Sequence, residues 1–167
     1  MKSPGAVRSY IVRVLNGMAQ GLFASLIIGL ILKQIGVYTG WGLLEQFGSI
    51  AQLLMGPAIG AGVALAVHAS PLGVVASIIT GAIGAGTVVT QAGAAPSLMI
   101  GEPVGALIAA LIGAEASRLI QGKTKVDIIL VPATAIIAGG VAGVLIAPVV
   151  SSFMSASLRI FACKAAS

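Results

Sequence analysis

The sequence predicts an all-α protein: a polytopic transmembrane helical bundle with about five membrane segments. Hydrophobic residues make up 58% of the 167 residues and charged residues only 8%, whereas about a quarter of a soluble domain is charged. Such a chain cannot cover a water-soluble globule with polar side chains, and its mean hydropathy is +1.12. The sequence also lacks the alternating apolar and polar residues of a membrane barrel, so helices are expected to cross the bilayer.

Five apolar stretches are long enough to span a bilayer, which takes about 20 helical residues. Four of them are uncharged, and the fifth is interrupted only by Glu102. In chain order they are Val14–Leu32, Phe47–Val67, Pro71–Thr90, Ser97–Gly113 and Ile128–Val150. No small-residue cleavage site ends the first stretch, so it is expected to remain as a membrane helix and not to be a cleaved signal.

The segment around Glu102 is predicted to be broken or re-entrant at Gly101–Pro103. The residue before a proline disfavours the α conformation, and the adjacent glycine weakens a helix further. Pro103 suits the first position of a helix that runs to about Ile120, with Glu102 as its N-cap. Residues Gln91–Ile100 then form a loop or re-entrant hairpin, which at membrane depth must be buried in protein or line a water-filled cavity.

The basic residues predict the orientation of the chain. The nine Lys and Arg residues lie at span ends and in loops, as the positive-inside rule expects, and the net charge of +5 does not indicate nucleic-acid binding. With five crossings, Lys2, Arg8, Arg13, Arg118, Lys123 and Lys125 share one side, against Lys33, Arg159 and Lys164 on the other. This asymmetry places the N-terminus and the Ala114–Lys125 loop in the cytoplasm.

Pairs of glycines at four-residue spacing predict closely packed helices. The pairs are Gly17/Gly21, Gly56/Gly60, Gly101/Gly105 and Gly139/Gly143. A phosphate-binding loop is the competing interpretation, but no glycine-rich run has the spacing and the Lys-Ser/Thr pair of a P-loop. Cys163 is the only cysteine, so no intrachain disulfide or cysteine-rich metal site is expected. We predict no catalytic, cofactor-binding or metal-binding residue, and no cofactor.

Two residues are candidate substrate ligands, Glu102 and His68. An ionisable residue at membrane depth costs at least about 2.5–3.5 kcal/mol, which favours a solute-binding carboxylate at Glu102 over a simple helix cap. His68, the only histidine, lies in a tight turn between two spans. Substrate binding and a solvated loop residue are open alternatives for it. Glu115 and Arg118 are three residues apart on one helix and are expected to pair.

Three stretches resemble a bacterial membrane family. They are "VLNGMAQGLFASLIIGLIL", "TQAGAAPSLMIGEPVGALIAALIGAE" and "GKTKVDIILVPATAIIAGGVAGVLIAPVVSSFM". Together they resemble the EIIC-like permease family of the phosphotransferase system, which includes perfringolysin O regulator-like proteins. Better-understood sugar EIIC proteins carry a Gly-Ile-Thr-Glu-Pro motif whose carboxylate binds sugar hydroxyls. Here only the Glu-Pro of Glu102-Pro103 matches, and that match carries the sugar-binding role over to Glu102.

The resemblance implies residues 1–154 as an EIIC-like transmembrane domain, the N-terminal half of the family's length, and 155–167 as a divergent tail. It implies a multi-pass protein of the bacterial cytoplasmic membrane that binds and translocates a sugar-like solute. The expected partners are membrane lipid, the solute, soluble phosphotransferase components, and a second copy or a missing C-terminal half. No separate phosphorylated domain is visible, so this chain alone is not expected to transfer phosphate. The alternative is a sensor that transports nothing and signals through its basic loop.

Overall fold

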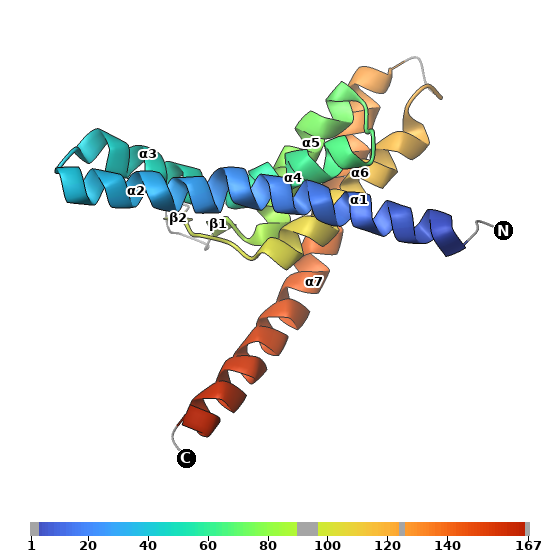
Figure 1. Ribbon diagram of the computed structural model, residues 1–167. Coiled ribbons are helices and arrows are strands. Elements are labelled where there is room, and N and C mark those ends of the chain that lie inside the picture. Colours follow the sequence, from blue (N-terminus) through green and yellow to red (C-terminus); the bar gives the residue numbers. More distant parts are fainter. Residues whose placement is uncertain (1–3, 90–96, 124–125, 166–167) are drawn as a thin grey trace.

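A long helical rod begins the chain (Figure 1). The structure, a computed structural model, describes the backbone of residues 4–89, 97–123 and 126–165. Helix α1 (Pro4–Leu22) continues through a π-helical turn, η1 (Phe23–Ile27), into α2 (Ile28–Thr39). The rod formed by α1, η1 and α2 contains an apolar run of 35 residues, which is about 52 Å long at ~1.5 Å per residue. The rod therefore exceeds the ~30 Å hydrocarbon core and extends well beyond the predicted span Val14–Leu32.

The second predicted span, Phe47–Val67, is bent and not straight. Helix α3 (Gly42–Leu53) and helix α4 (Met55–Ala66) meet at Leu54 with an angle of 56°. Pro57 accounts for the bend, because a proline has no N–H to donate to the carbonyl four residues earlier and its ring clashes there. Helix α3 folds back along α2, and the bend then turns the chain into the bundle (Figure 1).

The third predicted span, Pro71–Thr90, is a shorter helix than expected. Helix α5 runs from Pro71 to Ala85. The Ser70 side chain caps its start by accepting a hydrogen bond of 3.1 Å from the Gly73 N–H, an arrangement that suits proline at the first helical position. Gly86 ends the helix with φ of 67°, the left-handed conformation that glycine adopts without steric cost. The predicted end, Thr90, lies outside the described residues.

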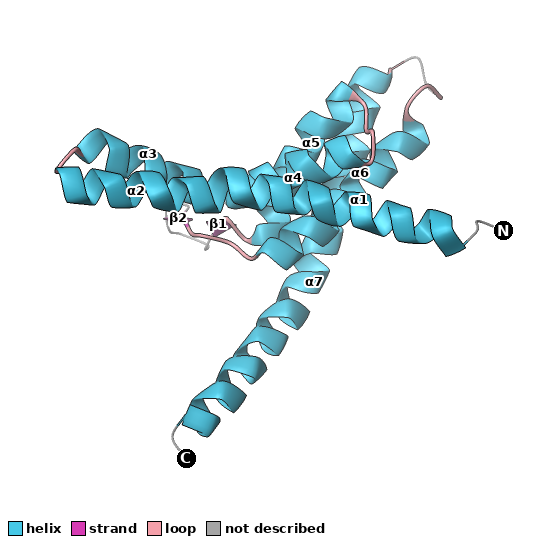
Figure 2. Ribbon diagram, in the orientation of Figure 1, coloured by secondary structure: helices cyan, strands magenta, loops and turns pink. Residues whose placement is uncertain are grey.

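A short hairpin connects α5 to α6. Strands β1 (Val88–Val89) and β2 (Ser97–Leu98) pair antiparallel, with Val88 opposite Leu98. Figure 2 shows these strands beside the helices, and residues 90–96 between them are not described. Helix α6 then runs from Pro103 to Ile120. The predicted break before Pro103 and the predicted end of this helix are both confirmed.

Helix α7 (Asp127–Ala165) contains the predicted span Ile128–Val150. It packs against α5 and α6 in its first half, and its second half extends away from the other helices (Figure 1). The helix passes through residue 154 without a break. The division of the chain into residues 1–154 and a divergent tail stays a prediction.

Small residues form the core where α4, α5 and α6 pack between α1 and α7. The predicted glycine pairs all face neighbouring helices: Gly17/Gly21 face α4, Gly56/Gly60 face α5, Gly101/Gly105 face the end of α5, and Gly139/Gly143 face α5 and α6. A methyl group at Gly139 would lie 2.7 Å from the Ala109 carbonyl oxygen, closer than van der Waals contact allows. Alanine dominates the rest of this core, with Met55, Ile59, Val63 and Val131 as its largest apolar members.

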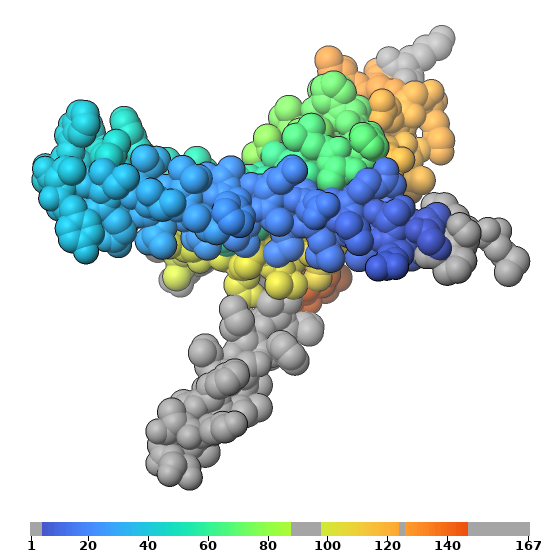
Figure 3. Space-filling model, in the orientation of Figure 1, coloured from blue at the N-terminus to red at the C-terminus, as the bar shows by residue number. Residues whose placement is uncertain are grey.

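The outer surface is apolar, as a lipid-facing surface should be. Large apolar side chains are exposed along α1, η1, α2 and α7, among them Ile11, Phe23, Ile31, Ile137 and Val144. In the space-filling view the rod from α1 to α2 lies across one face of the bundle (Figure 3). Among the described residues, three helices are long and apolar enough to span a membrane, or four if α3 and α4 count as one bent span. The predicted all-α membrane bundle is confirmed.

Candidate functional site

Glu102 occupies the N-cap position of α6, as predicted, but its carboxylate does not cap the helix. The residue is extended, with φ of −94° and ψ of 128°, and its side chain makes no cap hydrogen bond. Its backbone does the anchoring: the Glu102 N–H donates to the Ala85 carbonyl oxygen at 2.8 Å, and the Glu102 carbonyl oxygen accepts from the Ala106 N–H at 3.2 Å. The main chain of this half-buried residue is therefore held in place, and its carboxylate is not used by the helix.

Two interruptions of regular structure meet beside Glu102. Helix α5 ends at Ala85, and Gly101 packs against that same residue just before α6 starts. The Met99 N–H donates to the Thr87 carbonyl oxygen at 2.9 Å, which ties the two arms of the connection together. Thr87 is only 2% exposed, and its hydroxyl has no hydrogen-bond partner among the described residues. Membrane transporters build solute sites from broken helices of this kind.

His68 lies at the other end of α5, in the turn from α4. Its φ of 57° makes it the one non-glycine residue with a positive φ in the described chain. Histidine tolerates this left-handed conformation better than most residues. The imidazole is exposed and borders a pocket of about 580 Å³.

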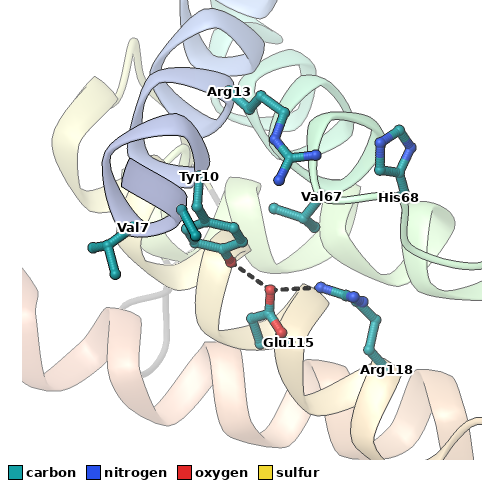
Figure 4. A pocket seen from close by; sticks show the side chains of 8 residues that line it. Val7, Tyr10, Arg13, Val67, His68, Glu115 and Arg118 are labelled. Atoms are coloured by element: carbon teal, nitrogen blue, oxygen red, sulfur yellow. Dashed lines mark hydrogen bonds and ion pairs between the residues drawn. The ribbon is translucent and has the colours of Figure 1, made fainter. Parts of the chain in front are cut away.

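The pocket beside His68 brings together three segments that are distant in sequence (Figure 4). Its lining residues are Ala6, Val7, Tyr10, Arg13, Val67, His68, Glu115 and Arg118. Glu115 is its centre: one carboxylate oxygen accepts from the Tyr10 hydroxyl and from the Arg118 guanidinium at 2.9 Å. The predicted Glu115–Arg118 pair is confirmed, and Tyr10 adds a tie between α1 and α6.

The structure does not bring the two predicted ligands together. Helix α5 has 15 residues, so at ~1.5 Å per residue its ends are roughly 22 Å apart. Glu102 is anchored at the C-terminal end of this helix, and His68 precedes its N-terminal end. One sugar ring cannot contact both residues in this conformation. Their roles as substrate ligands stay predictions.

The pocket also brings together three chain segments that the predicted topology places on one side of the membrane. Arg13 of α1, His68 of the α4–α5 turn and Arg118 of α6 line the same pocket, so these three segments lie at one end of the bundle. The five predicted spans put an even number of crossings between these segments, which agrees with this arrangement. Which side of the membrane that end faces stays a prediction from the basic residues.

Sequence reasoning missed two groups of polar residues. Arg13 was used only in predicting the orientation, and Tyr10 was not considered, because the contact of Tyr10 with Glu115 joins residues more than a hundred positions apart in sequence. Thr87 was overlooked because a single threonine in an apolar stretch carries no signal of its own. No cluster of three His, Cys, Asp or Glu side chains suited to a metal ion occurs among the described residues.

Comparison with known proteins supplies the family. A family model described as "Phosphotransferase system, EIIC" matches residues 12–160. No curated protein and no solved structure gave a significant match to the chain. The matched range includes the broken junction at Glu102, the helices packed through glycine, and most of the pocket beside His68. The chain belongs to the EIIC family of the phosphotransferase system.

Proposed function

We propose that this chain binds a sugar-like solute and translocates it across the membrane, with Glu102 as a ligand of the solute. Family membership makes the chain a membrane component of a sugar phosphotransferase system. The observation that carries the finer proposal is the Glu102 carboxylate, which lies at the N-cap of α6 without capping it. A half-buried charged group that the fold does not use is available to a ligand.

The chemistry of the junction suits a polyhydroxy solute. An ionised carboxylate only accepts hydrogen bonds, and its bonds to hydroxyl groups are about twice as strong as bonds between neutral groups. The first backbone N–H groups of α6 have no partner within the helix, so they can donate to hydroxyl oxygens of the same solute.

The orientation proposed from the basic residues places the His68 pocket on the cytoplasmic side and the α2–α3 turn outside. In this orientation the chain is a multi-pass protein of the bacterial cytoplasmic membrane. Soluble phosphotransferase components would meet it at the end that carries Arg13 and Arg118. The Glu102 junction then lies roughly 24 Å from Arg118, since 16 residues of α6 separate them at ~1.5 Å each.

A sugar panel on the purified chain tests the proposal. Binding is measured by thermal shift, and labelled-solute counterflow is measured in proteoliposomes, with protein-free liposomes as the control. We expect one sugar class to raise the melting temperature and the same class to exchange across the membrane. Saturable binding without counterflow would contradict transport and support the alternative of a sensor that transports nothing. No binding by any sugar of the panel would contradict both.

A further inference from the structure

The His68 pocket has features that a solute site at Glu102 does not require. It is formed by α1, the α4–α5 turn and α6, and its volume is about 580 Å³. In Figure 4 the Arg13 guanidinium lies next to Val67, and the Arg118 guanidinium points to the Glu115 carboxylate. Both arginines therefore line the same pocket, Arg13 from α1 and Arg118 from α6.

The charges of this pocket do not balance. Glu115 is the one carboxylate among the lining residues and is already paired with Arg118 at 2.9 Å. Arg13 forms no ion pair with any described residue. Arg13 and Arg118 against Glu115 leave a surplus positive charge. The Tyr10 hydroxyl donates its hydrogen bond to Glu115, so it is not available as a donor to a ligand. His68 adds a ring N–H donor at the rim.

The rest of the lining is apolar and open to the outside of the bundle. Ala6 and Val7 form the α1 side of the pocket, and Val7 is about half exposed. The next turn of the rod continues with exposed Ile11. A ligand that fits these surroundings has an anionic head for Arg13 and an apolar part that follows α1.

We propose that this pocket binds the phosphate group of an anionic phospholipid, with Arg13 as its principal ligand and His68 at its rim. Guanidinium groups bind phosphate through paired, charge-assisted hydrogen bonds. Basic pockets between membrane helices are known places for phospholipid head groups. The exposed apolar face of α1 favours a lipid over a soluble phosphate ester, because it gives the acyl chain a surface to cover.

The test compares lipid binding by the purified full chain and by two variants that lose the same charge. Arg13→Gln removes the unpaired guanidinium, and Arg8→Gln removes an exposed cation from the same helix that does not line the pocket. Melting temperature and retained lipid, by native mass spectrometry, are measured in phosphatidylcholine with increasing phosphatidylglycerol. We expect phosphatidylglycerol to stabilise the wild type, and Arg13→Gln to weaken its apparent affinity roughly tenfold. Arg8→Gln should behave as the wild type does.

Two further arms keep the outcome decisive. Arg13→Lys preserves the charge but not the paired geometry, so an intermediate affinity supports the site even if Arg13→Gln folds poorly. Glycerol phosphate in solution supplies the head group without acyl chains. Equal losses in Arg13→Gln and Arg8→Gln would overturn the pocket, since they would reflect bulk surface charge. Protection by glycerol phosphate at the concentration effective for the lipid would overturn the lipid assignment.

Discussion

The backbone N–H of Glu102 donates a hydrogen bond of 2.8 Å to the carbonyl oxygen of Ala85. This bond joins the residue before α6 to the last residue of α5, and it fixes the position of Glu102 through its main chain. The Glu102 side chain makes no hydrogen bond that caps α6. Substitutions that alter only the carboxylate should therefore act on a ligand and not on the fold.

Glu102→Gln tests this separation. We expect solute affinity to fall about ten- to a hundred-fold, since a hydrogen bond to a charged group contributes about 1.5–3 kcal/mol. The melting temperature should remain near that of the wild type. Glu45→Gln is the matched control, because Glu45 is an exposed carboxylate on α3. Unchanged affinity together with a lowered melting temperature would instead give the Glu102 carboxylate a structural role at the start of α6.

The topology can be checked by single-cysteine labelling in a Cys163→Ser background. Ser9→Cys and Lys123→Cys should both resist an impermeant reagent in intact cells, because α1 begins and α6 ends at the proposed cytoplasmic end. Tyr38→Cys should be labelled, since Tyr38 is 86% exposed near the α2–α3 turn and an odd number of crossings separates that turn from Ser9. Labelling of Ser9→Cys from outside would reverse the orientation.

Two adjacent glycines of α7 should respond oppositely to alanine. A methyl group at Gly139 would lie 2.6 Å from the Thr80 Cγ2 atom, whereas one at Gly140 would lie 3.7 Å from the Ile83 Cδ1 atom. Gly139→Ala should lose about 1–3 kcal/mol by overpacking. Gly140→Ala should be neutral or slightly stabilising, because alanine favours helix by up to ~1 kcal/mol over glycine. Thermal unfolding in one detergent compares them, and equal effects would contradict the packing.

The Tyr10–Glu115 contact should couple α1 to α6. Tyr10→Phe removes the hydroxyl donor and should reduce stability by roughly 1 kcal/mol. Tyr38→Phe is the control, since its hydroxyl lies on an exposed residue. A double-mutant cycle with Glu115→Gln should give a coupling of about 0.5 kcal/mol or more. Additive losses would show that the hydroxyl and the carboxylate do not interact in the membrane.

Association is expected as well. A largely apolar groove along α7 is lined by Ile83, Ile136, Ile137, Gly140, Val141, Val144 and Leu145. Close van der Waals packing against such a face stabilises helix pairs in lipid, so the chain should form oligomers in mild detergent. Light scattering or native mass spectrometry over a range of protein concentrations would measure this. A mass that remains monomeric throughout would argue against it.

The sequence predicted the elements that depend on local rules. Pro103 sets the start of α6, and Glu102 precedes it, because proline restricts the residue before it and suits the first helical turn. The same local rule applies at Pro57, but the continuous apolar run around it suggested an unbroken span. The structure shows the 56° bend at Leu54 instead. Gly86 ends helix α5 before the predicted end at Thr90. The sequence did not predict this end, because a glycine can mark either the end of a helix or a close packing position within it.

The arrangement of the candidate sites was not accessible in the same way. Glu102 and His68 were considered together because both are rare polar residues in apolar surroundings, but sequence distance says nothing about which end of α5 each one occupies. The pocket at Arg13 depends on contacts between α1 and α6 that only the folded chain creates. Glu115 and Arg118 could be predicted to pair because they lie three residues apart on one helix. Tyr10 lies on a different helix, and its contact with Glu115 cannot be predicted from sequence spacing.

The bend at Leu54 and the π-helical turn η1 have a joint mechanical consequence. Helices α3 and α4 both contact η1, so the bend and the turn lie beside each other. The α2–α3 hairpin thus joins the bundle through two irregular segments that lie side by side, and close packing at Gly29 and Gly48 holds its two helices together. Helix α2 has 12 residues, a lever arm of about 18 Å. A rotation of about ten degrees at this junction would therefore displace the Gly40 turn by about 3 Å.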